Sequence, residues 1–217
     1  MRSPRFHYCQ PLDGLSLPEA AATMLDQPDC LAIDQVNWPT PTSFMPSTHV
    51  RLAYSDQALY VLFTVNDNRV KAIQTQPQSA VCQDSCVEFF MRLPDKNEYW
   101  NFEFNAIGTA NASRRERRDC PTRLTENQLA TIGRWASLGT SPFDELPGDI
   151  QWSLLVRIPF TLIGIDINHL PALLYANFYK CGDLTAHPHY LSWAPVHSDR
   201  PNFHRPDDFS PITFSVP

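Results

Sequence analysis

One stretch of the sequence alternates between apolar and polar residues, and a second stretch just before it is mostly apolar. In residues 99–106 (YWNFEFNA), Trp100, Phe102 and Phe104 fall on one side of an extended chain, with polar residues between them. Residues 85–92 (SCVEFFMR) are rich in apolar residues that favour strands, and PDKN at 94–97 has the composition of a tight turn. The pattern predicts a β-hairpin with one face in a hydrophobic core.

Similar strand signals recur along the chain. Strands are expected at residues 50–54, 58–66, 151–158, 174–180 and 211–216, and the turn at 55–57 predicts a second hairpin. Two short segments favour a helix, residues 17–25 with Pro18 near the first turn, and residues 159–164. Residues 111–125 are polar and are expected to form a loop.

Proline is abundant, with 20 prolines against 7 glycines in 217 residues, and it suits edge strands and ordered loops better than long helices. No βαβ rhythm, repeat or internal boundary is visible. The sequence therefore predicts a single domain over residues 1–217. Its expected fold is an all-β, antiparallel two-sheet β-sandwich, of jelly-roll or immunoglobulin-like type, with one or two short helices.

Charge and hydropathy exclude several classes of protein. A net charge of −6 argues against a general nucleic-acid binder, which needs a basic surface. No apolar run approaches the roughly 18 residues of a membrane span, and no apolar segment of a secretory signal follows the basic N-terminus. The six cysteines are too few for a disulfide scaffold and are expected to be reduced. A cytoplasmic location is expected, or export if a leader has been trimmed away.

Polar residues interrupt the predicted strands. Glu88 lies inside an apolar run, where a carboxylate is costly unless it is paired, for example with Arg92, or borders a cleft. The polar side of residues 99–106 is either a solvent face or the floor of a site for a polar ligand. It carries Tyr99, Asn101, Glu103 and Asn105.

Later in the chain, Asn177 interrupts the expected strand at 174–180, and Trp193 lies in a proline-bounded segment. Such a tryptophan is either a core residue or a flat recognition surface. Aromatic rings cover the apolar face of a pyranose, while carboxylates and amides bond its hydroxyl groups. The residue types together suggest a sugar site.

Several blocks of the sequence resemble the carbohydrate-binding family 9-like proteins. They extend over most of the chain, from about residue 30 to residue 215, and the resemblance to the xylanase-attached family 9 modules is more distant. The blocks are residues 36–39 (VNWP), 84–90 (DSCVEFF), 99–109 (YWNFEFNAIGT), 176–183 (ANFYKCGD), 191–193 (LSW) and 201–204 (PNFH).

This resemblance implies a β-sandwich that holds terminal sugar units in a slot between two tryptophan rings, with carboxylate, arginine and asparagine hydrogen bonds. It places Trp193 at one ring, Glu88 at the slot carboxylate and Asn105 at the strand amide. Glu103 stands where the modules have an arginine.

Cys82 stands where the family usually has the second tryptophan, so half of the aromatic clamp is missing. Either another aromatic residue such as Tyr99 or Trp38 substitutes, or the sugar slot is degraded. The family 9 modules also carry structural calcium. Oxygen ligands for a possible calcium ion are available at Asp56, Asp67 and Asp84, although no calcium-loop motif is readable.

The sequence thus predicts non-catalytic binding of a terminal sugar or short oligosaccharide, with carbohydrate as partner and neither nucleic acid nor membrane. The alternatives are a hydrolase with paired carboxylates, a partner-binding sandwich with a degenerate sugar site, and a metal or haem protein using His187 and His189 or a methionine. The arginine-rich run at 114–118 is a solvated loop or a site for an anionic partner such as a uronic-acid glycan. The predicted ligand-binding residues are Trp193, Glu88, Asn105, Glu103, Asn177 and Tyr99.

Overall fold

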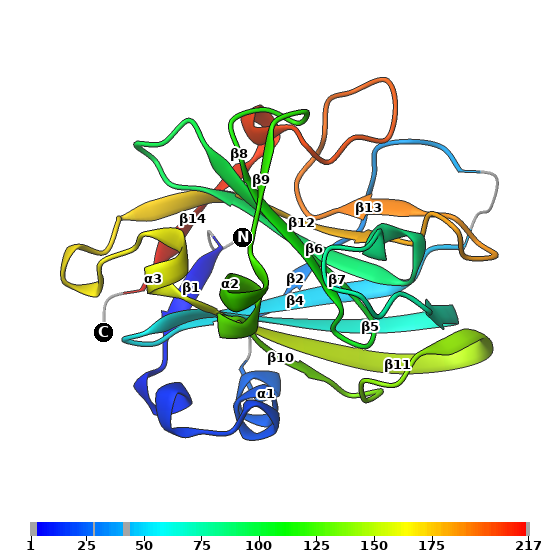
Figure 1. Ribbon diagram of the computed structural model, residues 1–217, viewed down its shortest axis with the longest axis horizontal. Coiled ribbons are helices and arrows are strands. Elements are labelled where there is room, and N and C mark those ends of the chain that lie inside the picture. The colour runs from blue at the N-terminus through cyan, green and yellow to red at the C-terminus, as the bar shows by residue number, and fades with distance from the viewer. Residues whose placement is uncertain (1–3, 28, 41–43, 216–217) are drawn as a thin grey trace.

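The computed structural model describes residues 4–27, 29–40 and 44–215 (Figure 1). Within them the chain forms 14 strands and three short α-helices. The helices are α1 (Leu17–Leu25), α2 (Glu126–Thr131) and α3 (Phe160–Ile163). The strands are β1 (Arg5–Tyr8), β2 (Leu31–Ala32), β3 (Gln35–Val36), β4 (Ser47–Tyr54), β5 (Ala58–Ala72), β6 (Cys86–Arg92), β7 (Tyr99–Asn105), β8 (Ala110–Arg115), β9 (Pro121–Arg123), β10 (Gly133–Ala136), β11 (Phe143–Pro159), β12 (Leu173–Cys181), β13 (Tyr190–Ser192) and β14 (Ser210–Phe214).

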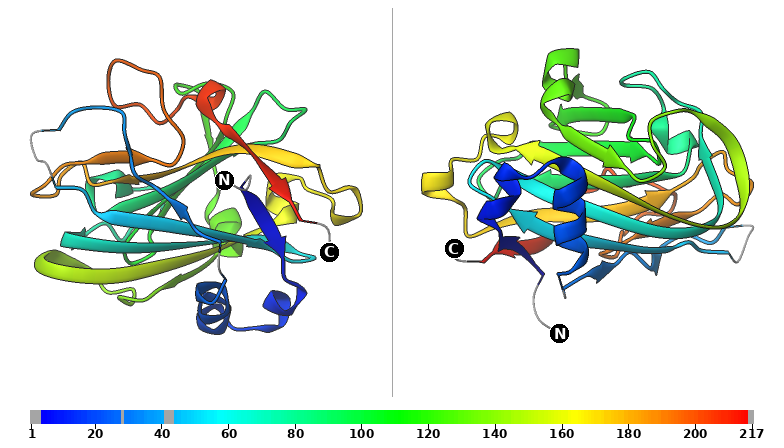
Figure 2. Two further views of the ribbon diagram at one scale, coloured as in Figure 1. Left: turned by 180° about the vertical axis from the view of Figure 1, so that it is seen from behind. Right: turned by 90° about the horizontal axis from the view of Figure 1, so that it is seen from below.

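The strands form two sheets packed face to face (Figures 1 and 2). One sheet has the order β10-β11-β5-β4, with β2 paired to β4. The other has the order β14-β12-β6-β7-β8-β9, with β13 and β3 attached beside β12. This architecture confirms the predicted β-sandwich. β1 departs from the expected antiparallel pattern, because it pairs in parallel with both β4 and β14 and so links the two sheets.

The hydrophobic core lies between the sheets. Phe63 of β5 and Phe178 of β12 meet with ring centroids 6.3 Å apart, and Phe89 of β6 stacks on Phe178 at 5.2 Å. Phe102 and Phe104 of β7 are fully buried in the same cluster. The alternation of residues 99–106 therefore identified the inner face of this sheet correctly.

The outer face of the β12-β6-β7-β8 sheet is also covered. Tyr99 and Asn101, on the polar side of β7, are fully buried rather than exposed to solvent. The reason is that residues 193–209, between β13 and β14, fold back over this face and are drawn in orange to red at the top of Figure 1; we call them the fold-back segment. Phe203 of that segment stacks on Tyr179 of β12 with centroids 4.1 Å apart, and Phe209 packs beside Tyr99 at 5.9 Å.

Helix α1 occupies the predicted residues. It begins after Ser16, whose backbone N–H and hydroxyl both donate to the carboxylate of Glu19, and these two hydrogen bonds stabilise the first turn. Its buried residues Ala20, Ala21 and Met24 pack on the outer face of the other sheet. Among the described residues, no helix is long and apolar enough to cross a membrane.

Three strand predictions need correction or extension. Residues 111–125, expected to be a loop, contain most of β8 and all of β9, because pairing with β7 accommodates the charged sequence at the sheet edge. β5 and β11 are longer than expected and stay paired past Pro147 and Gly148 through two register shifts. The strand predicted at 211–216 corresponds to β14, which ends at Phe214. Residue 216, the last of the predicted strand, lies outside the described residues.

Candidate functional site

Side chains on the outer face of the β12-β6-β7-β8 sheet form rows that cross the strands. The pairing register aligns one residue of each strand with its neighbours, and residues two apart on a strand share a face. The central row is Tyr179, Glu88, Glu103 and Asn111. The adjacent row is Cys181, Cys86 and Asn105.

A cleft of about 270 Å³ lies over these rows, and we call it the acidic cleft. Its floor comes from the sheet, one wall comes from β8 and the residues after it, and the other comes from the segment after β12 and the fold-back segment. The lining residues are Cys82, Glu88, Glu103, Asn111, Arg115, Arg118, Cys181, Asp183, Tyr190, Pro201, Asn202, Phe203 and His204.

Glu103 is held rigidly at the floor of the acidic cleft. Asn101 donates to Oε1 of Glu103 at 2.9 Å, and Asn111 donates to Oε2 at 2.8 Å. Nε of Arg115 donates to Oδ1 of Asn101 at 2.7 Å, which fixes the orientation of that amide. Burial raises the pKa of Glu103, while the two amide hydrogen bonds and the charge of Arg115 oppose the rise.

Glu88 lies directly opposite Glu103 and has weaker partners. In the part of the chain that the structure describes, its carboxylate accepts only from the thiols of Cys181 at 3.3 Å and Cys86 at 3.9 Å. Burial raises the pKa of Glu88 well above its ordinary value, and the neighbouring Glu103 adds to the rise. Because thiols are weak donors, Glu88 retains hydrogen-bonding capacity that a ligand in the cleft can use.

Asn105 and Asn177 are buried but do not line the acidic cleft, and both side chains already bond to the protein. The amide of Asn105 donates to Asp84 at 2.9 Å and to a backbone carbonyl, and its oxygen accepts from Thr109 N–H. Asn177 exchanges two hydrogen bonds with the backbone of Ala194. In this structure both asparagines fasten loops to the sheet.

Trp193 and Tyr99 also lie outside the acidic cleft. The Trp193 ring is half-buried and contacts Phe178 edge-on at 5.8 Å, so it packs against the core between the sheets. Tyr99 is buried, and its hydroxyl lies 3.0 Å from Nδ1 of His204, which does line the cleft. Of the six predicted binding residues, the structure brings Glu88 and Glu103 together in the cleft.

The aromatic surface of the acidic cleft comes from Tyr190 and Phe203, both of them half-buried. Cys82, where a tryptophan was expected from the resemblance, lines the same cleft. Trp38 cannot substitute as an open platform, because its ring is buried and its Nε1 donates to a backbone carbonyl at 2.7 Å.

The sequence singled out the arginine-rich run at 114–118 but did not predict that two of its arginines share a cleft with Glu88 and Glu103. Arg115 and Arg118 line the acidic cleft, whereas Arg114 and Arg117 line a separate groove on the other side of the sheet edge. Recognising residues 110–115 as a strand would have placed Arg115 on the same face as Asn111, since the two residues are four apart.

The three aspartates expected as calcium ligands each have a partner within the protein, although Oδ1 of Asp84 and Oδ2 of Asp67 accept no hydrogen bond from the described residues. Asp84 accepts from two backbone N–H groups, Asp56 accepts from a tyrosine hydroxyl, and Asp67 pairs with the buried ammonium of Lys180. No cluster of potential metal ligands among the described residues includes any of the three, and calcium stays a prediction. The ring nitrogens of His189 lie beside the Lys180 ammonium and a backbone carbonyl.

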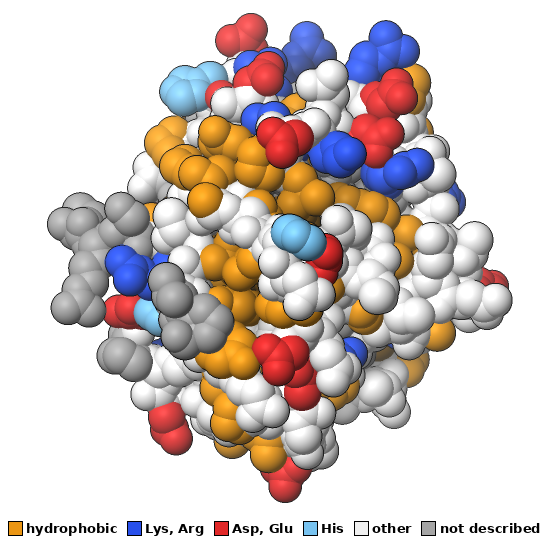
Figure 3. Space-filling view, turned by 90° about the vertical axis from the view of Figure 1, so that its left-hand side faces the viewer, with side chains coloured by type: hydrophobic (Ala, Val, Ile, Leu, Met, Phe, Trp, Pro, Cys, Tyr) orange, Lys and Arg blue, Asp and Glu red, His pale blue; other side chains and the backbone are white. Residues whose placement is uncertain are grey.

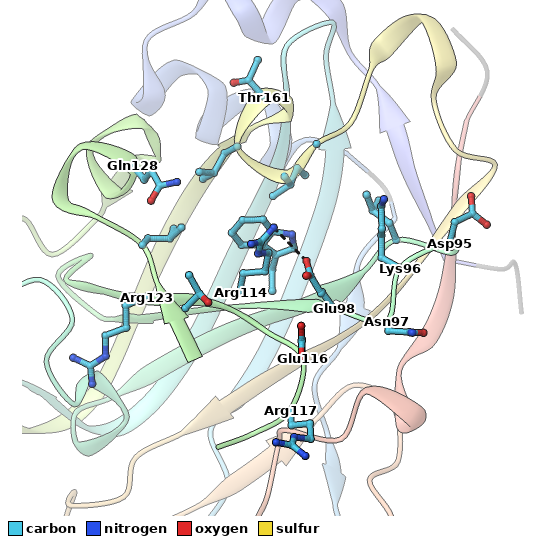
Figure 4. Close-up of a pocket in the computed structure, with 17 residues that line it drawn as sticks. Asp95, Lys96, Asn97, Glu98, Arg114, Glu116, Arg117, Arg123, Gln128 and Thr161 are labelled. Carbon is cyan, nitrogen blue, oxygen red and sulfur yellow. Dashed lines mark ion pairs between the residues drawn. The ribbon is translucent and has the colours of Figure 1, made fainter. Parts of the chain in front are cut away.

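The separate groove is larger, about 1100 Å³, and lies between the β6–β7 turn, β8, β9, α2 and α3. On the side of the molecule shown in Figure 3, acidic and basic side chains gather together at the top, above a broad hydrophobic area. Figure 4 shows Arg114 and Glu98 paired within the groove, at 3.3 Å, with Gln128 and Thr161 on its rim. Its charges are exposed and of both signs, so it lacks the buried carboxylates that distinguish the acidic cleft.

Comparisons with known proteins agree with this architecture. The sequence model of carbohydrate-binding family 9 matches residues 19–214. A candidate carbohydrate-binding protein from Bacteroides uniformis has a similar structure, with a TM-score of 0.85 and 27% sequence identity over 99% of this chain and 100% of that chain. None of the curated proteins compared with the chain matches it.

Two further solved structures share the fold. One is a family 9 carbohydrate-binding module from Caldicellulosiruptor kristjanssonii in complex with cellotriose, with a TM-score of 0.60 and 12% identity over 98% of this chain and 93% of that chain. The other is a family 9 module from the same organism in complex with glucose. It has a TM-score of 0.52 and 13% identity, and 83% of each chain is covered.

Proposed function

Because the chain belongs to carbohydrate-binding family 9, we propose that it binds carbohydrate without catalysis and that the acidic cleft receives a terminal sugar or the end of a short oligosaccharide. The observation that carries this proposal is Glu88, a buried carboxylate at the cleft floor whose partners among the described residues are thiols. A sugar hydroxyl supplies the stronger donor that this carboxylate lacks.

The remaining cleft residues supply the other contacts that a sugar needs. The guanidinium groups of Arg115 and Arg118 donate to hydroxyl oxygens, and Asp183 accepts from hydroxyl groups. Tyr190 and Phe203 offer ring surface to the apolar face of a pyranose. The cleft volume of about 270 Å³ lies near the lower end of the range for small-molecule sites, which suits one sugar unit.

The arrangement of the two carboxylates supports binding rather than hydrolysis. Glu88 and Glu103 are directly opposite each other on neighbouring strands and share one face of the sheet. A glycosidase instead places its two carboxyl groups on either side of the scissile bond, about 5 to 9.5 Å apart. With both carboxylates beneath the ligand, neither is positioned to act from its opposite side.

The test is a calorimetric titration of neutral mono- and disaccharides, with and without calcium, into the wild-type protein and three variants. Glu88→Gln should weaken binding about 10- to 150-fold, because a hydrogen bond to a charged group contributes about 1.5 to 3 kcal/mol. The matched control Glu98→Gln alters the separate groove and should leave the affinity unchanged. Tyr190→Ala should also weaken binding, since the ring lines the acidic cleft.

Trp193→Ala distinguishes this cleft from the slot implied by the family resemblance. If Trp193→Ala abolished binding while Glu88→Gln and Tyr190→Ala had no effect, the ligand would occupy a different site. If no sugar bound to the wild-type protein, the sugar-binding proposal would fail and the sandwich would be assigned to the recognition of another partner.

A further inference from the structure

We propose that Cys86, Cys181 and Glu88 form a binding site for one thiophilic divalent metal ion, with Zn²⁺ as the preferred ion. Their potential ligand atoms all lie within 4.8 Å of one another. The proposed ion would sit beneath the acidic cleft, and its fourth coordination position would face the cleft. This proposal does not depend on sugar binding.

The spacing of the three ligand atoms suits tetrahedral zinc. Oε1 of Glu88 lies 3.3 Å from Sγ of Cys181 and 3.9 Å from Sγ of Cys86. Zinc–sulfur bonds of about 2.3 Å and a zinc–oxygen bond of about 2.1 Å, at a tetrahedral angle, place sulfur and oxygen about 3.6 Å apart. The two observed distances bracket this value, so small side-chain rotations bring all three atoms to an ion.

The strands hold these ligands in place. Cys86 and Cys181 are directly paired across β6 and β12, and Glu88 is two residues from Cys86 on the same face of β6. Their exposed fractions are 0%, 1% and 3%, respectively. All three lie on paired strands rather than on loops, which is the arrangement that keeps a metal site in one geometry.

The chemistry of the cluster calls for a cation. A buried carboxylate with only thiol donors is poorly stabilised, whereas a divalent ion supplies two positive charges at the centre of the cluster. Arg115 and Arg118 line the same cleft and offset the excess negative charge of a site with two thiolates and a carboxylate. Two sulfur ligands favour zinc over calcium or magnesium, which prefer oxygen.

One coordination position remains for a ligand from the cleft. Glu88 and Cys181 both line the acidic cleft, while Cys86 lies behind them. Three protein ligands plus one exchangeable position describe an open zinc site rather than a closed structural one. A water molecule or a hydroxyl group from the cleft would complete the coordination.

The experiment uses the full chain, reduced and metal-free, with no sugar present. Zn²⁺ is titrated by calorimetry, and Co²⁺ is titrated by absorption, since thiolate ligation of cobalt gives a charge-transfer band. We expect the protein to bind one equivalent of either metal ion, and the cobalt-bound protein to show the charge-transfer band. Cys86→Ser and Cys181→Ser should each weaken Zn²⁺ binding about 100-fold or more, because loss of a ligand costs at least as much as loss of an outer-shell contact.

Cys82→Ser is the matched control, because Cys82 lines the same cleft but lies outside the three-residue cluster. It should leave the stoichiometry and the charge-transfer band unchanged. Circular dichroism checks that each variant folds. An independent measurement on the wild-type protein is alkylation mapped by mass spectrometry, in which Zn²⁺ should slow modification of Cys86 and Cys181 but not of the exposed Cys30 and Cys120.

Three results would overturn the proposal. They are an absence of Zn²⁺ binding, a cobalt spectrum without thiolate ligation, and a loss of affinity in Cys82→Ser equal to that in Cys181→Ser. Since these titrations contain no sugar, their failure leaves the sugar-binding proposal untouched. A failed sugar titration likewise leaves the metal proposal standing.

Discussion

A buried lysine crosses the core behind the acidic cleft. The ammonium of Lys180 is fully buried on the inner face of β12, 3.4 Å from Oδ2 of Asp67 on β5 in the opposite sheet. It donates to the carbonyl of Cys181 at 3.0 Å and lies 2.7 Å from Nε2 of His189. The carbonyl and the imidazole take two of the ammonium protons, and the attraction between the ammonium and the Asp67 carboxylate connects the two sheets.

Removal of one member of this pair should be strongly destabilising. Lys180→Met leaves the Asp67 carboxylate buried without its cation, and Asp67→Asn leaves the ammonium without its anion, each at a cost of about 3 to 5 kcal/mol. The double variant carries neither charge. Its main loss is the hydrogen bond to Nε2 of His189, which leaves a buried acceptor without a donor and costs about 1 to 3 kcal/mol of unfolding free energy. The two changes together should therefore cost at least about 3 kcal/mol less than the sum of the single changes.

Urea unfolding at equilibrium measures these free energies. The control is Arg117→Met, which removes an exposed ion pair with Asp119 whose side chains are 74% and 80% accessible, and it should cost less than about 1 kcal/mol. A Lys180→Met variant no more destabilised than Arg117→Met, or a double variant with the full sum of the single losses, would show that the buried ion pair does not stabilise the fold.

Two further predictions concern the fold-back segment and the turn after β12. Burial lowers the pKa of His204 to about 3 from 6.5, so its contribution to stability is complete above pH 6.5 and is lost as the pH falls toward 3. The free energy of unfolding should fall by up to about 1.4 kcal/mol per pH unit in that window, and His204→Gln should flatten the slope in urea titrations. A Cβ on Gly182 would lie 2.9 Å from Cγ2 of Thr185, so Gly182→Ala should cost about 1 to 3 kcal/mol, whereas Gly14→Ala, which meets no atom within 4 Å, should leave the melting temperature nearly unchanged.

The parts of the fold that were predictable are those set by local pattern. Alternation along β7 identified its inner face, and the segment beginning at Leu17 has the apolar spacing and first-turn proline of α1. β8 was missed because four arginines between residues 114 and 118 mask its alternation, and because its partner β7 supplies the pairing that makes it a strand.

The candidate site was likewise predictable only in part. Glu88 and Glu103 were recognisable because a carboxylate in an apolar strand is costly to bury unless it has a partner or borders a cleft. Tyr190 and Phe203 belong to a cleft that exists only after the C-terminal segment folds back, which no local pattern encodes. Trp193 was singled out by its proline-bounded segment and by the resemblance, and its half-buried ring contacts Phe178 edge-on in the structure.

The alternation of β12 also separates two sets of charges that are adjacent in the sequence. Lys180 is next to Cys181 but points to the opposite face, where Asp67 neutralises it. Within the acidic cleft, Arg115 and Arg118 are the described cations that face Glu88, Glu103 and Asp183.

A ligand that brought its own carboxylate would add a fourth acid to a cleft with two arginines, and like charges at close range oppose binding. We therefore expect a neutral hexose to bind more tightly than its uronic acid, which argues against the anionic-glycan interpretation of the arginine-rich run. Calorimetric titration of such a pair of sugars measures the ratio of their affinities. Tighter binding of the uronic acid, lost in Arg118→Met, would show instead that the arginines set the specificity of the cleft.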